Sequence, residues 1–182
     1  LFTHDTEVNL GFLPALCNTV PSASETGVDE LASSDTLRDF LTSWKFSGHL
    51  DTTEAELDAV RATRHEIRDI WGADELTLAA WVNTTLATAR AIPQLVDHDG
   101  LGWHIHAVDH NDPLARRILA EAAMSFIDVI RGGRLDRLRF CEADDCDGIL
   151  VDLSKNGTKR FCSTRCGNRM AVRAYRARAH EA

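Results

Sequence analysis

Four of the five cysteines in this 182-residue chain form two close pairs near its end. Cys141 and Cys146 are separated by four residues, fifteen residues follow, and Cys162 and Cys166 are separated by three. Each pair can occupy one edge of a tetrahedron from a tight turn, and the segment between them brings the pairs together. Two disulfides, or four unrelated thiols, are the alternatives. The regular pairing favours one metal ion held by four thiolates.

The chemistry of the four thiolates favours Zn²⁺ over iron, because they form a soft site without carboxylate ligands. The site is also closed, so it leaves no position for a substrate water. We therefore expect one structural zinc ion and no catalysis at this site. A module of about 45 residues is small enough to need a metal for its stability.

The segment between the cysteine pairs predicts how the module folds. The stretch 148–154 contains β-branched and other apolar residues that favour a strand, and Asn156-Gly157 is typical of a hairpin turn from which 158–161 can return. Ser163 is then a candidate N-cap for a helix. This order of turn, hairpin, turn and helix predicts a treble-clef-like zinc finger.

The net charge of −8 conceals a strong division along the chain. Residues 1–154 hold 12 basic and 27 acidic residues, whereas 155–180 hold eight basic residues and no acid. An acidic body with a basic contact surface indicates a polyanionic partner, and DNA is the partner we expect. The alternative is a solvated helix end, although such surfaces normally mix both signs.

The basic residues follow a helical pattern after Cys166. Arg169, Arg173 and Arg176 fall on one helical face, whereas Arg178 lies roughly opposite Arg169. Met170, Ala174 and Ala177 would form a second face that packs on the body. The predicted nucleic-acid contacts are Lys159, Arg160, Arg165, Asn168, Arg169, Arg173, Arg176 and Arg178.

The residues before the finger are predicted to be mainly helical, so the fold class is α+β with mostly helices. Thr53 and Glu56 can form a capping box, and Asn111 and Pro113 mark the start of another helix. Helices are expected at about 5–20, 35–46, 53–71, 74–90 and 111–132, with a domain boundary that gives domains 1–135 and 136–182.

One segment of the first domain has the pattern of a β-hairpin. Residues 94–96 and 103–108 flank the turn-rich stretch Asp97-His98-Asp99-Gly100. His104 and His106 alternate on the second strand, so both face the same side. Ordinary strand histidines are the more common interpretation of this pair, and a second metal site is the alternative.

The cysteine-rich end resembles a known family. Cys166-Gly167-Asn168-Arg169, preceded by the Cys141 and Cys146 pair, resembles the CGNR zinc finger. Upstream, Cys17-Asn18-Thr19-Val20, Arg64 and the helix over 111–132 resemble the ABATE domain, which precedes this finger in bacteria. The resemblance covers nearly the whole chain and implies a cytoplasmic, bacterial, stress-induced transcriptional regulator. Many relatives have a basic residue where this chain has Met170 or Ala171. The resemblance therefore implies fewer contacts with phosphate in this chain.

Arg64 stands out because it lies within the apolar stripe of the helix over 53–71. A buried guanidinium must be paired. Internal pairing, to which Asn18 could contribute, is the first interpretation. A pocket in which Arg64 and Asn18 bind an anionic effector is the second. Cys17 is expected to be a buried core residue.

These observations lead to three hypotheses. The first is a DNA-binding regulator whose helical domain senses a ligand or forms a homodimer. The second is a protein-interaction module, and the third is a small-molecule-binding protein with a pocket around Arg64. We expect no enzyme, because no Ser/His/Asp, Cys/His or phosphate-loop pattern occurs. No membrane span or secretory signal is expected, and residues before Leu1 are expected to be missing.

Overall fold

The computed structural model describes residues 1–97 and 102–181, in which helices predominate. The N-terminal part contains α1 (His4–Cys17), α2 (Ser34–Ser43), α3 (Glu54–Ile70), α4 (Glu75–Ala89) and α5 (Leu114–Arg131), with the hairpin of β1 (Gln94–Asp97) and β2 (Trp103–His106). After a short 3₁₀ turn, η1 (Leu135–Arg137), follow β3 (Leu138–Phe140), β4 (Ile149–Val151) and α6 (Thr164–Glu181). Both hairpins are antiparallel.

The predicted helices and the first hairpin are confirmed. The predicted capping box forms only in part: the side chain of Thr53 accepts a hydrogen bond from Glu56 N, whereas the side chain of Glu56 accepts from Thr52 N, one residue before the cap. The start of α5 differs from the prediction. Pro113 is its N-cap, and the amide of Asn111 instead donates to Asp109. Residues 98–100 of the predicted turn lie outside the described residues.

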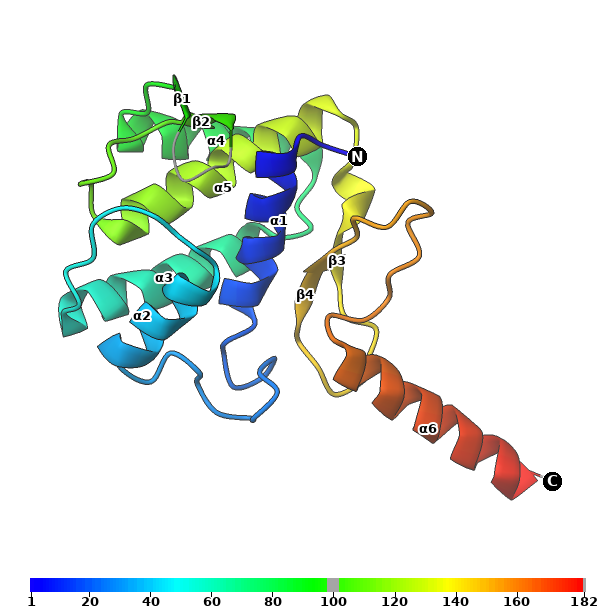
Figure 1. Cartoon of the computed structure of the whole chain (residues 1–182). Coiled ribbons are helices and arrows are strands. Elements are labelled where there is room, and N and C mark those ends of the chain that lie inside the picture. Colours follow the sequence, from blue (N-terminus) through cyan, green and yellow to red (C-terminus); the bar gives the residue numbers. More distant parts are fainter. Residues whose placement is uncertain (98–101, 182) are drawn as a thin grey trace.

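The helices enclose an apolar core in which α5 is central (Figure 1). Its apolar stripe places Ile118 and Phe126 fully out of contact with water. Phe126 packs edge-on against Trp71 of the α3 end and Trp81 of α4. None of the described helices combines the length and the apolar character that crossing a membrane requires.

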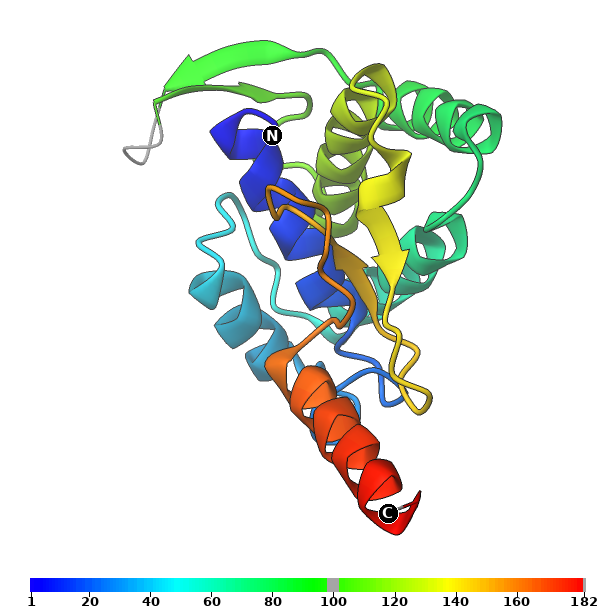
Figure 2. The same cartoon turned by 90° about the vertical axis from the view of Figure 1, so that its right-hand side faces the viewer.

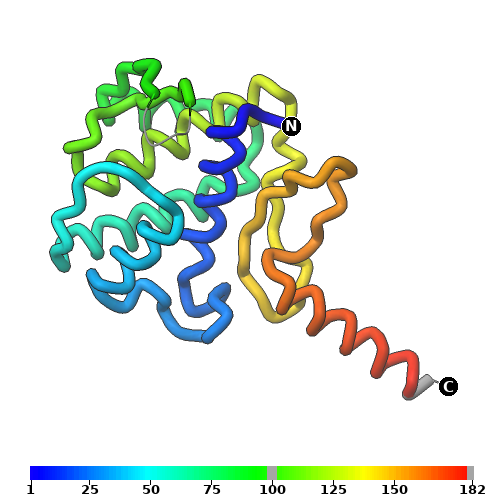
Figure 3. Tube along the Cα trace, in the orientation of Figure 1, coloured from blue at the N-terminus to red at the C-terminus, as the bar shows by residue number. Residues whose placement is uncertain are grey.

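The core also includes the hairpin that carries the first cysteine pair. Leu138, Ile149 and Val151 are buried in the same cluster as α1, α3 and α5. The Cα trace shows that β3 and β4 lie alongside α1 (Figure 3). It also shows that α6 extends away from the body. A view from a second side agrees (Figure 2). The finger is therefore built onto the helical part through a shared core.

The hairpin predicted within 148–161 is wrong. Residues 149–151 pair with the preceding strand, 138–140, and not with a later one. The first cysteine pair therefore lies at the end of this hairpin. The side chain of Asp152, which is fully buried, accepts hydrogen bonds from Ser154 N and Lys159 N. These bonds hold the following residues as a loop, because the amide groups that a returning strand needs are already occupied.

Candidate metal centre and nucleic-acid interface

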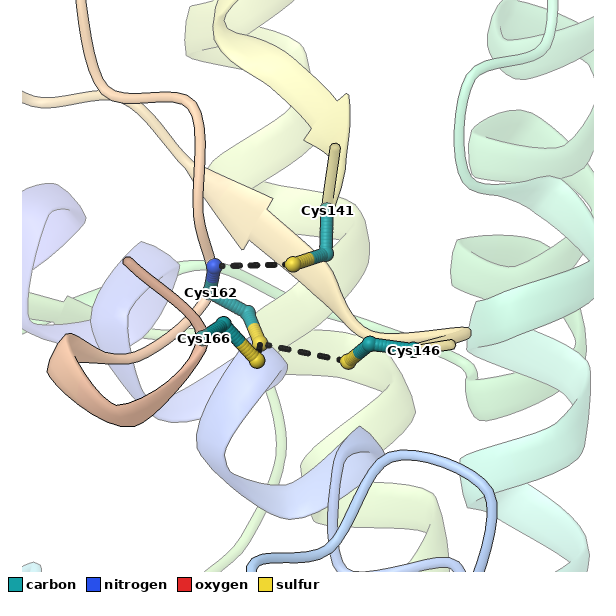
Figure 4. A group of neighbouring side chains, drawn as sticks. All are labelled: Cys141, Cys146, Cys162 and Cys166. Carbon is teal, nitrogen blue, oxygen red and sulfur yellow. Dashed lines mark hydrogen bonds between the residues drawn. The ribbon is translucent and has the colours of Figure 1, made fainter. Parts of the chain in front are cut away.

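The four predicted metal ligands converge at the end of the β3–β4 hairpin and the start of α6 (Figure 4). All four Sγ atoms lie within 4.8 Å of one another. The Sγ atoms of Cys146 and Cys162 are 3.6 Å apart, and those of Cys162 and Cys166 are 3.7 Å apart. Tetrahedral zinc with Zn–S bonds of about 2.3 Å separates its sulfur ligands by roughly 3.8 Å. The donors therefore fit one zinc ion.

Backbone amides around the cysteines support thiolate ligands. Gly148 N donates to Cys146 Sγ at 3.3 Å, and Cys162 N donates to Cys141 Sγ at 3.4 Å. Hydrogen bonds of this kind orient metal ligands and stabilise their negative charge. Gly148 is also required sterically, because a Cβ at this position would lie 2.7 Å from Cys162 Sγ. Together these features match a structural zinc site of four cysteines.

The thiols differ in their electrostatic surroundings. Burial raises the pKa of Cys146 and of Cys162. Burial opposes ionisation of Cys166 as well, but the hydrogen bond to Ser163 and the neighbouring thiols lower its pKa. Cys17 lies apart from the cluster and is fully buried in the helical core, where burial raises its pKa to about 12. The prediction that Cys17 is a core residue is confirmed.

Helix α6 begins at this metal centre and extends outward. Ser163 Oγ accepts from Cys166 N, which confirms the predicted N-cap. Residues 171–179 are all exposed. The prediction that Ala174 and Ala177 pack on the body is therefore wrong, because the body does not extend beneath this part of the helix (Figure 1).

The structure divides the predicted nucleic-acid contacts into two groups. Arg169 and Arg173 form ion pairs with Asp145 of the first cysteine turn, at 2.8 and 2.9 Å. Arg160 pairs with Glu142 at 2.6 Å. The remaining predicted contacts are exposed, and none has a side-chain partner among the described residues: Lys159, Arg165, Asn168, Arg176 and Arg178.

Several of these side chains share one surface. A shallow groove along α6 is lined by Arg165, Asn168, Arg169, Val172, Arg173 and Arg176. Arg178 is not among these residues, which agrees with its predicted place on the other side of the helix. We call this surface the α6 groove.

Asp145 is the residue that sequence reasoning missed. The two arginines lower its pKa against the opposing effect of desolvation. Arg169 also donates to Cys166 Sγ at 3.4 Å. Asp145 and Arg169 thus fix α6 against the first cysteine turn. The signal was present in the sequence, because Asp144-Asp145 lies inside the metal-binding turn that must face the basic helix.

Arg64 is paired inside the protein. Its guanidinium donates to both carboxylate oxygens of Asp29, at 2.8 and 2.7 Å, and to Thr19 Oγ1 at 2.8 Å. The side chain is 2% exposed, and the hydrogen bonds lower the pKa of Asp29. The expectation that Asn18 contributes to this pairing is wrong, because Asn18 instead bonds to the backbone of Ile149. Both residues of the predicted effector site therefore have structural partners.

Comparison with known families agrees with this architecture. Residues 14–133 match the ABATE family, described as a putative stress-induced transcription regulator. Residues 137–179 match the CGNR zinc finger. No curated protein matches the chain.

Proposed function

The chain belongs to the ABATE family and carries a CGNR zinc finger after that domain, and on this basis we propose that it is a DNA-binding transcription regulator. The zinc ion is structural, and it anchors the helix α6. This helix contacts the base edges or the phosphates of the duplex. The acidic helical part is the regulatory body, and it keeps non-specific contacts with DNA confined to α6.

The observation that carries the proposal is the exposure of a basic helix. Residues 171–179 of α6 are exposed, and the segment 155–180 contains eight basic residues and no acid. The helix projects from the body (Figure 1), and its C-terminal end extends past the body in the second view as well (Figure 2). An isolated helix of this kind has the dimensions that the major groove admits, and arginine can bond both phosphates and guanine.

Salt dependence tests the proposal directly. We expect the full-length protein to bind a DNA duplex of mixed sequence. The logarithm of the association constant should fall linearly with the logarithm of the salt concentration. Each phosphate contact contributes a slope of about −0.9 on B-DNA. Fluorescence anisotropy between about 50 and 200 mM salt measures it. Binding to no DNA, or binding that salt leaves unchanged, would contradict the proposal.

Exposed arginines provide the matched variants. Arg165→Ala and Arg176→Ala remove residues of the α6 groove that form no ion pair with the described residues, so zinc content should not change. Each should weaken binding, and removal of one bond to phosphate should make the slope shallower by about 0.9. Arg131→Ala removes an exposed arginine of α5 and serves as the control.

A second candidate function is protein interaction through the same helix. Val172 and Tyr175 are 48% and 68% exposed, and apolar side chains on a projecting helix favour a protein partner or a second copy of this chain. Sedimentation of the wild type and of Val172→Ser/Tyr175→Ser distinguishes the functions. Protein interaction is favoured if the wild type self-associates and does not bind DNA, and if the double variant no longer self-associates.

A further inference from the structure

Two histidines of the helical part lie together on β2, far from the cysteine cluster. His104 and His106 have their Nε2 atoms 3.2 Å apart and their ring centroids 5.0 Å apart. This confirms that both side chains face the same side of the strand. His104 is 8% exposed and the side chain of His106 is 30% exposed, so the pair is partly shielded from solvent.

The opposite nitrogen of each ring meets an oxygen acceptor. His104 Nδ1 lies 2.7 Å from the carbonyl oxygen of Gly102, and His106 Nδ1 lies 3.3 Å from Glu121 Oε1. A carbonyl oxygen only accepts, so His104 Nδ1 carries the proton, and the carboxylate of Glu121 favours the same tautomer of His106. In a neutral imidazole Nε2 then carries the lone pair. Histidines that bind metals are held in this way, with Nδ1–H donated to a carboxylate or a backbone carbonyl.

At this separation the two Nε2 atoms can share a hydrogen bond, or they can bind one metal ion together. A tetrahedral ion with Zn–N bonds of about 2.0–2.1 Å separates its nitrogen ligands by roughly 3.3 Å. The observed 3.2 Å agrees with this value. We propose that His104 and His106 bind a divalent transition-metal ion through their Nε2 atoms.

A pocket gives this site access to solvent and to a further ligand. It has a volume of about 310 Å³, and His104, His106 and Glu121 line it together with the aromatic rings of Phe12, Trp44 and Phe46. Among the described residues the protein supplies two ligand atoms, because the only described cluster of three or more is that of the cysteines. Water, or a small ligand with an oxygen donor, would complete the coordination from the pocket.

Glu121 is a positioning residue in this proposal. Asn9 of α1 donates to Glu121 Oε2 at 3.0 Å, while Oε1 faces His106 Nδ1. The carboxylate is thus fixed between α1 and β2, and it orients the His106 ring. Loss of an outer-shell partner of this kind reduces metal affinity by about 10–100-fold.

Metal stoichiometry of the full-length protein tests the proposal. Protein equilibrated with micromolar Zn²⁺ should hold two ions per chain, and one after brief treatment with a mild chelator, because the four-thiolate site binds more tightly. His104→Ala and His106→Ala should each hold one ion. His65→Ala, which removes an exposed histidine of α3, should hold two.

Co²⁺ substitution separates the two sites without relying on activity. The intense sulfur-to-metal absorption of the cysteine site should be unchanged in both histidine variants, while the second, weaker spectrum is lost. Glu121→Gln should retain both spectra but require about 10–100-fold more Co²⁺ for the second. If His104→Ala fails to fold, the more exposed His106→Ala carries the test. One ion per wild-type chain, or two in folded His106→Ala, would overturn the proposal and leave a proton between the rings.

Discussion

The side chain of Asn18 and the backbone of Ile149 exchange two hydrogen bonds, each 2.8 Å long. Asn18 is the C-cap of α1, and Ile149 begins β4, next to the cysteine cluster. Ile149 is fully buried, so its amide and carbonyl have no access to water. The pair therefore joins the helical part and the finger through contacts that only one relative orientation satisfies.

Asn18→Ala should weaken this junction. It leaves the amide and carbonyl of Ile149 without their partners, which costs about 2 kcal/mol or more of folding free energy. Chemical denaturation followed by circular dichroism measures the loss. Asn83→Ala, at an exposed position of α4, is the control and should change the stability by less than about 0.5 kcal/mol. Equal stability of the two variants would show that the junction rests on apolar packing alone.

Asp29→Asn should reduce both the stability and its dependence on pH. Hydrogen bonding to Arg64 lowers the pKa of Asp29 below the ordinary value of 3.8. The stabilisation is therefore complete above this value and is lost as the pH falls through the folded-state pKa. Removing the charge leaves buried Arg64 unpaired and costs about 3 kcal/mol at neutral pH. Denaturation midpoints between about pH 2 and 7 should fall less steeply on acidification in this variant than in the wild type.

Zinc removal should unfold part of the protein. A strong chelator, or Cys162→Ser, removes the constraint on α6 and on the loop after Asp152. Hairpin β3–β4 should persist, because Leu138 and Ile149 belong to the main core. Hydrogen exchange is expected to show loss of protection at 153–181 and retention in α1, α3 and α5. Global loss of protection would mean that the helical part depends on the metal.

Asp145→Asn should strengthen DNA binding. The Asp145 carboxylate is paired with Arg169 and Arg173, so it competes with phosphate for the same guanidinium groups. Its removal is expected to raise the affinity by about 3- to 10-fold and to make the salt dependence steeper. Asp51→Asn, which removes an exposed acid paired with His49, is the control. Weaker binding instead would show that Asp145 orients the arginines for DNA.

Local signals in the sequence predicted the helices, the first hairpin and the metal ligands. Cysteine spacing identifies the zinc site because each pair must lie in one tight turn. Caps such as Thr53 and Ser163 locate helix starts because they satisfy amides only a few residues away. Apolar periodicity in α5 identified a core helix for the same local reason.

Pairings between distant residues were not predictable in this way. The choice of β3 rather than 158–161 as the partner of β4 depends on the buried carboxylate of Asp152 and on the helical core. The partners of Arg64 and Asn18 lie 35 and 131 residues away along the chain. Sequence alone shows that such groups need partners, but the packed fold determines which residues supply them.

The anchoring of α6 at Cys166 has a consequence for how the helix forms. Ordering the first turn is the unfavourable nucleation step of a helix, whereas each later residue adds its own hydrogen bond. Ser163 and the metal ligands fix this first turn, and beyond Met170 the described helix has no cover from the body. The zinc ion thus acts as the nucleus of a helix whose other support is its pair of ion pairs with Asp145. The presence of zinc should determine whether the arginines are arranged along a helix or distributed along a disordered chain.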